Sequence, residues 1–159
     1  MEGSVSMKLE VNASASEAWK VHGSLLLPKI IMDRFPERYS DFKVVEGDGH
    51  SGTIVEVFYS SVVPGPKWYR EEYTVVDDVK RFKLATMLKG GVLEQGFKSY
   101  VTRLEALEKE GKPDVCILTA AVDYVFEDES ALQVISLEDF YQIFKAVEDY
   151  VINHKNTTN

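Results

Sequence analysis

The chain has 159 residues, of which 45% are hydrophobic and 28% charged, and this composition predicts one globular domain over residues 1–159. Its 18 basic and 26 acidic residues give a formal charge of −8, which argues against nucleic acids and anionic membranes as partners, because both attract basic surfaces. The sequence shows no signal peptide, no apolar run near the roughly 18 residues of a membrane span and only one cysteine, Cys116, so it predicts a cytoplasmic protein.

The first part of the chain is predicted to form a strand and two short helices. Residues 4–11 alternate between polar and apolar side chains, which is typical of a half-buried strand. Residues 12–17 supply a helix N-cap and an early acidic residue, and apolar residues follow at roughly helical spacing. Pro28 interrupts this pattern, and a second short helix is predicted over Lys29–Phe35.

From Tyr39 onward the hydrophobic period changes to two. Glycine-rich or charged connections separate the segments, and consecutive strands with short connections indicate an antiparallel meander rather than β–α–β units. The predicted strands are Asp41–Glu46, Thr53–Tyr59, Lys67–Val76, Arg81–Leu88, Phe97–Leu107 and Val115–Phe126.

The segment from Ser136 is predicted to be a long amphipathic helix, with polar residues such as Glu148 facing away from the protein. The element order then predicts an α+β fold, in which a curved antiparallel sheet of about seven strands wraps around this helix. Such a sheet leaves an internal cavity where the inward side chains do not fill the space. The predicted inward stripe of the helix is Leu137, Phe140, Ile143, Phe144, Val147, Tyr150 and Val151.

Several apparent motifs have plain structural interpretations. Residues 47–52 match the dinucleotide-binding pattern G-x-G-x-x-G, but a predicted strand follows where that site needs a helix, so a hairpin loop is favoured. His22, His50 and His154 lie on separate elements without metal-ligand spacing, so no metal site is predicted, and His22 is assigned to a helix surface or to packing. Cys116 lies among apolar residues and is interpreted as a buried structural thiol.

A cluster of polar residues on two neighbouring strands is the strongest candidate site. Tyr69, Glu71, Tyr73 and Val75 share one face of the first strand, and Lys83, Ala85 and Met87 share one face of the second. If these faces line the cavity, burial raises the pKa of the carboxyl and lowers that of the ammonium, while their proximity opposes both shifts. Groups poised in this way suit acid–base chemistry near neutral pH. The pattern alone leaves open a surface-facing Glu–Lys pair on an exposed sheet.

Whether Glu71 and Lys83 share a face depends on the register of their strands. Both face the cavity only if paired residue numbers sum to an even value, which requires an odd-length turn around Asp77–Lys80 or a β-bulge. A regular two-residue turn would place the two side chains on opposite faces of the sheet.

The loop Glu46–Thr53 resembles the glycine-rich loop of the major birch-pollen-allergen family, also called pathogenesis-related class 10 plant proteins. The stretches Tyr69–Tyr73, Arg81–Lys83 and Gly90–Leu93 resemble the norcoclaurine-synthase-like and norbelladine-synthase-like branch of that family. The resemblance extends over the whole chain and implies the helix-grip fold of the family.

By motif alignment, the resemblance implies that Tyr69, Glu71 and Lys83 are catalytic, and that Thr102 stands where the family has a tunnel aspartate. It implies a cofactor-free enzyme of plant alkaloid metabolism that condenses an arylethylamine with an aldehyde, by Pictet–Spengler closure or by imine formation. In that role Lys83 is the general acid and Glu71 the base, whereas Tyr69 and Thr102 offer hydrogen bonds. The remaining candidates for contact with substrate are Tyr73, Tyr100, Met87, Phe35, Tyr39, Phe140 and Phe144.

A non-catalytic alternative stays open at this point. The same cavity can carry a plant hormone, a phenolic compound or an alkaloid without changing it, and the missing acid at Thr102 favours this interpretation. A defence role is a further alternative. The expected assembly is a monomer or a weak homodimer.

Overall fold

In the computed structural model, which describes residues 1–157, seven strands form one antiparallel sheet in the order β1-β7-β6-β5-β4-β3-β2. The strands are β1 (Glu2–Val11), β2 (Tyr39–Glu46), β3 (Thr53–Tyr59), β4 (Trp68–Asp77), β5 (Phe82–Gly90), β6 (Phe97–Lys109) and β7 (Lys112–Phe126). The helices are α1 (Ala15–His22), α2 (Leu26–Arg34) and α3 (Leu137–Thr157), with 3-10 helices η1 (Gly91–Glu94) and η2 (Glu129–Val134). The predicted α+β class and helix-grip architecture are confirmed.

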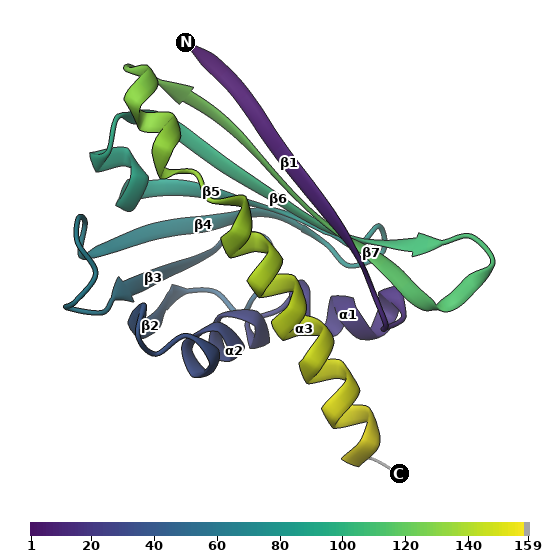
Figure 1. The fold of residues 1–159 in the computed structure, drawn as a ribbon. Coiled ribbons are helices and arrows are strands. Elements are labelled where there is room, and N and C mark those ends of the chain that lie inside the picture. The colour runs from purple at the N-terminus through teal and green to yellow at the C-terminus, as the bar shows by residue number, and fades with distance from the viewer. Residues whose placement is uncertain (158–159) are drawn as a thin grey trace.

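The long helix α3 crosses one face of the curved sheet, and α1 and α2 lie beside it (Figure 1). β1 and β2 form opposite edges of the sheet, so α1 and α2 carry the chain from one edge to the other. α3 packs against α1, α2 and β1. This arrangement encloses space between the sheet and the three helices. Within the described chain, none of the helices combines the length and the apolar character that crossing a membrane requires.

Local sequence accounts for the starts of the two short helices. Ser14 and Glu17 form a capping box at α1, in which the serine hydroxyl accepts from the Glu17 N–H at 3.1 Å. α2 begins at Leu26, earlier than predicted, and Pro28 lies inside it. The prediction that Pro28 interrupts the helix was wrong, because a proline in the first turn removes only an N–H that has no partner within the helix.

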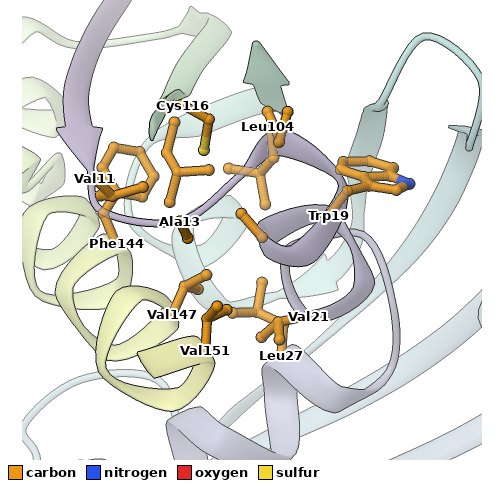
Figure 2. Close-up of a cluster of buried hydrophobic side chains, with 14 of the residues drawn as sticks. Val11, Ala13, Trp19, Val21, Leu27, Leu104, Cys116, Phe144, Val147 and Val151 are labelled. Carbon is orange, nitrogen blue, oxygen red and sulfur yellow. The ribbon is translucent and has the colours of Figure 1, made fainter. Parts of the chain in front are cut away.

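The main hydrophobic core lies between α3, α1 and the sheet. In Figure 2, Val147 and Val151 of α3 approach Val21 and Leu27 from the short helices. Phe144 of the same helix lies beside Val11 of β1. The predicted inward stripe of α3 is therefore largely confirmed, but its first residue differs. Leu137 is 41% exposed at the first position of the helix.

Glu148 was predicted to face solvent and is buried instead. Its carboxylate accepts a hydrogen bond of 2.7 Å from the backbone N–H of Asn12, which follows β1, and another of 2.5 Å from Lys145. Periodicity could not find this position, because the partner that makes the burial tolerable lies at the other end of the chain.

Candidate active site

A cavity of about 150 Å³ lies between the sheet and the helices α2 and α3. Its walls are mostly apolar and come from these two helices and from the strands β2, β3, β4, β5 and β6. The polar side chains on these walls are Tyr39, Tyr69, Glu71, Tyr73, Lys83 and Thr102.

A β-bulge brings Glu71 and Lys83 to the same wall. Next to the turn, Val76 pairs with Lys83 and Val75 with Leu84, but farther along β4 Tyr73 pairs with Ala85. Thr74 is therefore an extra residue on β4, and it shifts the register by one. Its hydroxyl bridges the irregular position with contacts to the Leu84 carbonyl at 3.3 Å and the Thr86 hydroxyl at 3.0 Å.

The parity requirement derived from the sequence is thus met by a bulge, since the turn that joins Asp77 and Phe82 has an even length. One detail of the predicted face was wrong. Val76, rather than Val75, shares the side of Glu71 and Tyr73 and packs against the buried residues there, because the bulge reverses the alternation at this point.

Lys83 is the most deeply buried ionisable group on the cavity wall. The side chain is 1% exposed, and its Nζ lies 4.4 Å from the centre of the Tyr73 ring. Burial lowers the pKa of Lys83 to about 8, while the negative charge of Glu71 opposes this shift. The ring face of Tyr73 stabilises the remaining positive charge.

Glu71 is half-buried, and the surface that it retains faces the cavity. Burial raises its pKa to about 7, and the positive charge of Lys83 opposes this shift. Within the described chain the two groups act on each other through space without a direct ion pair. At neutral pH this wall therefore offers both a proton donor and a proton acceptor to a ligand between them.

Tyr39 and Tyr69 line the cavity, and the ring of Tyr59 contacts both, stacked on the first and tilted against the second. Tyr39 and Tyr59 are 5.7 Å apart between ring centroids, and Tyr59 and Tyr69 are 5.8 Å apart. Burial and the charge of Glu71 raise the pKa of Tyr69 well above its usual value. The phenols therefore stay protonated and can donate hydrogen bonds to a ligand.

The structure places the remaining candidates in two groups. Thr102, Tyr73, Tyr39 and Phe140 line the cavity together with Tyr69, Glu71 and Lys83. Four others lie outside its lining, namely Tyr100, Met87, Phe35 and Phe144.

Each of these four has a different environment. Phe144 is fully buried in the main core, because the inner face of α3 turns from the cavity to α1 at this point. Tyr100 packs edge-on against Phe97 at 5.4 Å. Met87 is the β5 partner of Glu71, beyond the part of this strand that reaches the cavity. Phe35 ends α2 and its ring lies 5.6 Å from the guanidinium of Arg38.

Sequence reasoning did not identify one feature near the site, and it left a second open, since His22 was assigned either to a helix surface or to packing. Residues of α2, which include Leu27 and Ile31, form part of the cavity wall. His22 is completely buried, and its ring meets that of Phe144 edge-on at 5.6 Å. Among the residues that the structure describes, neither of its ring nitrogens has a hydrogen-bond partner. Burial, with the charge of Lys83, lowers its pKa to about 3. The available signal was helical spacing, because His22 continues the buried row of Ala15, Ala18 and Trp19.

The other chemically conspicuous residues have structural roles. Cys116 is buried, as predicted, and burial raises the pKa of its thiol to about 11. The glycine-rich loop joins β2 to β3, as predicted, and Gly47, Gly49 and Gly52 have the positive φ angles that this hairpin needs. Among residues 1–157, no three His, Cys, Asp or Glu side chains are grouped as a metal site.

Comparisons with known proteins agree with this architecture. The model of the pathogenesis-related protein Bet v 1 family matches residues 1–154. The chain is 35% identical over 158 residues to norbelladine synthase of Narcissus pseudonarcissus, which covers 98% of the chain and 96% of that relative. It is 28% identical over 153 residues to S-norcoclaurine synthase 2 of Papaver somniferum, which covers 92% of the chain but only 64% of that longer relative. A solved structure of norcoclaurine synthase from Thalictrum flavum, in complex with dopamine and hydroxybenzaldehyde, is 25% identical with a TM-score of 0.84 and covers 97% of this chain and 88% of that one.

Proposed function

The chain belongs to the pathogenesis-related protein Bet v 1 family, and from this membership and the geometry of its cavity we propose that it is an enzyme that condenses an arylethylamine with an aldehyde. The observation that carries the proposal is the placement of Glu71 and Lys83 on one wall of a largely apolar cavity, with pKa values of about 7 and about 8. The related structure that holds dopamine and hydroxybenzaldehyde supports it, since these ligands are an arylethylamine and an aldehyde.

The first half of the proposed reaction forms an iminium. The amine nitrogen adds to the carbonyl carbon, and loss of a proton from nitrogen with protonation of oxygen gives a neutral carbinolamine. The Lys83 ammonium then donates a proton to the carbinolamine hydroxyl, and the C–O bond breaks to release water. A lysine with a pKa of about 8 is a good donor for this step, because it is largely charged at neutral pH yet gives up its proton readily.

The second half converts the iminium into a neutral product by loss of one proton. In imine formation Glu71 takes this proton from nitrogen. In Pictet–Spengler closure the electron-rich ring attacks the iminium carbon, and Glu71 takes the proton from the ring carbon that has formed the new bond. Proton transfer from Glu71 back to Lys83 restores the starting state. The net reaction releases one water molecule and requires no redox cofactor.

The other polar residues of the cavity orient the reactants. Tyr69 stays protonated next to Glu71 and donates a hydrogen bond to an oxygen of the ligand. Thr102 pairs with Ala85 across the sheet and offers a neutral hydroxyl on the same wall as Lys83. Tyr73 holds its ring against the Lys83 ammonium and limits the directions in which Nζ can point.

Incubation with dopamine or tyramine and a panel of aryl and alkyl aldehydes tests the proposal. Products are identified by mass spectrometry, before and after borohydride reduction of imines, beside heat-inactivated protein. We expect Lys83→Met and Glu71→Gln each to lower turnover by about 10²-fold or more. Lys89→Met and Glu72→Gln are matched controls, since these residues lie on the same two strands outside the cavity lining. Full turnover by both cavity variants would contradict the proposal.

The carrier function is the second candidate, and Thr102 favours it. A hydroxyl stands where the resemblance places an acid, and the rest of the wall is largely apolar, as in sites that hold a ligand unchanged. The two functions give different results in the same incubation. Tight binding with complete recovery of the unreacted amine and aldehyde, at the rate of the heat-inactivated control, identifies a carrier.

A further inference from the structure

The inner cavity cannot hold both reactants of the proposed enzyme at once. Its volume is about 150 Å³, and an engineered protein cavity of about 150 Å³ holds a single benzene molecule. A condensation that joins an arylethylamine to an aryl aldehyde brings two rings together. One of the two reactants must therefore extend out of the inner cavity.

A second pocket lies next to the inner cavity and offers the space for this extension. This outer pocket has a volume of about 410 Å³, and its walls include Arg38, Tyr39, Tyr59, Pro64, Gln95 and Asp139. Tyr39 lines both pockets. A reactant held at Glu71 and Lys83 can therefore project past Tyr39 into the outer pocket.

An ion pair spans the outer pocket beside Tyr39. The Arg38 guanidinium, just before β2, lies 2.9 Å from the carboxylate of Asp139 in the first turn of α3. Arg38 precedes Tyr39 in the chain, and its charge opposes the rise in the pKa of the Tyr39 phenol that burial causes. The pair therefore links α3 to the chain that enters β2 and is coupled to the residue shared by the two pockets.

We propose, on the basis of the function proposed above, that Arg38 and Asp139 determine substrate specificity: their ion pair narrows the passage between the pockets and limits the length of the reactant that projects outward. Without the pair, α3 is no longer tied to the chain that enters β2 at Tyr39. The passage then admits longer ring substituents. Small aldehydes that end before the ion pair are unaffected.

The chain contains a matched control for this role. Arg34 and Asp149 form a second Arg–Asp pair at 2.8 Å, also between the α2 side and α3, with comparable exposure, but neither residue lines the inner or the outer pocket. Exposed ion pairs contribute little to folding stability. Arg38→Ala and Arg34→Ala are therefore expected to fold equally well and to differ only in what they do at the passage.

The first assay measures kcat/KM with one amine and two aldehydes, benzaldehyde and its longer para-phenyl derivative. We expect the ratio of the long to the short aldehyde to rise about tenfold in Arg38→Ala and Asp139→Ala, and to keep its wild-type value in Arg34→Ala and Asp149→Ala. The double variant Arg38→Asp/Asp139→Arg, which restores the pair in reverse, is expected to return the ratio toward wild type. An unchanged ratio in the Arg38 and Asp139 variants overturns the inference.

The second assay needs no turnover, so it separates a failure of this inference from a failure of the proposed function. Stopped-flow fluorescence measures the rate at which the uncharged probe N-phenyl-1-naphthylamine enters the protein. We expect faster entry into Arg38→Ala and an unchanged rate for Arg34→Ala. If wild type converts none of the aldehydes but these rates differ as expected, the condensing function is wrong and the role of the pair in access is supported. Equal entry rates in all variants overturn the inference whether or not the enzyme turns over.

Discussion

Acidification should destabilise the protein through His22, whose imidazole is buried in its uncharged form. Its side chain is 0% exposed, and burial with the charge of Lys83 lowers its pKa from 6.5 to about 3. The unfolded chain takes up this proton near pH 6.5, whereas the folded chain takes it up only near pH 3. Between these values the unfolded state binds more protons, so the free energy of unfolding falls as the pH drops.

The size of this effect follows from the pKa shift. Each unit of pKa difference corresponds to about 1.4 kcal/mol, so the complete shift amounts to about 5 kcal/mol, of which about 3 kcal/mol is lost by pH 4.5. Since domains of this kind have free energies of unfolding of about 5–15 kcal/mol, His22 alone controls a substantial part of the stability.

Urea unfolding of wild type and His22→Leu, at about pH 7.5 and about pH 4.5, measures this contribution. Leucine is apolar and has no buried nitrogen atoms that need hydrogen-bond partners. We therefore expect the variant to be at least as stable as wild type at the higher pH. At the lower pH the variant should gain about 3 kcal/mol relative to wild type, because the titration of all shared groups, Glu71 included, cancels in the comparison.

The exposed His50 provides a control of opposite sign. A hydrogen bond to Asp48 raises the pKa of His50, so this group stabilises the folded state below its ordinary pKa and loses that contribution as the pH rises. His50→Gln should therefore lose relative stability at about pH 4.5 rather than gain it. If wild type and His22→Leu lose the same stability between the two pH values, His22 is not buried and neutral in the folded protein, and the reasoning is refuted.

Two further predictions concern the site and its frame. In a product assay, kcat should rise through about pH 7 as Glu71 loses its proton and fall above about pH 8 as Lys83 loses its proton. Glu71→Gln should remove the rise. A flat wild-type profile would contradict both roles. Gly90→Ala should destabilise the protein by about 2 kcal/mol more than Gly111→Ala in urea unfolding. Both glycines have similar positive φ angles, 75° and 76°. An added Cβ at Gly90 would lie 2.4 Å from the Trp68 carbonyl oxygen, whereas at Gly111 it would meet no atom of the described residues within 4 Å. Equal losses would show that backbone conformation, not this contact, sets the cost.

Hydrophobic period, with the glycine-rich and charged connections, was sufficient to locate the strands and the long helix of this fold. The strand predicted over residues 53–59 has the same bounds in the structure, and the other predicted strands differ from the observed ones by a few residues at their ends. Alternation over a strand and helical spacing over α3 are local properties, so the residues of each element alone specify them. The same holds for the capping box at Ser14 and Glu17.

Local sequence patterns could not predict the contacts between distant parts of the chain. The sequence stated the condition under which Glu71 and Lys83 share a wall, but only the paired strands show that Thr74 bulges to meet it. The burial of Glu148 depends on Asn12, 136 positions away. His22 is buried because α3 covers α1.

These positions share one physical cause. Hydrophobic periodicity shows which face of a helix or strand is buried, and this face is determined by the residues of that element alone. A register shift, a buried ionisable group or an ion pair across a pocket is stabilised by a partner from another element, so its free energy depends on how the elements pack. The fold of this chain could therefore be predicted from the pattern of its residues, whereas the ionisation of its site and the access to it became visible only in the packed structure.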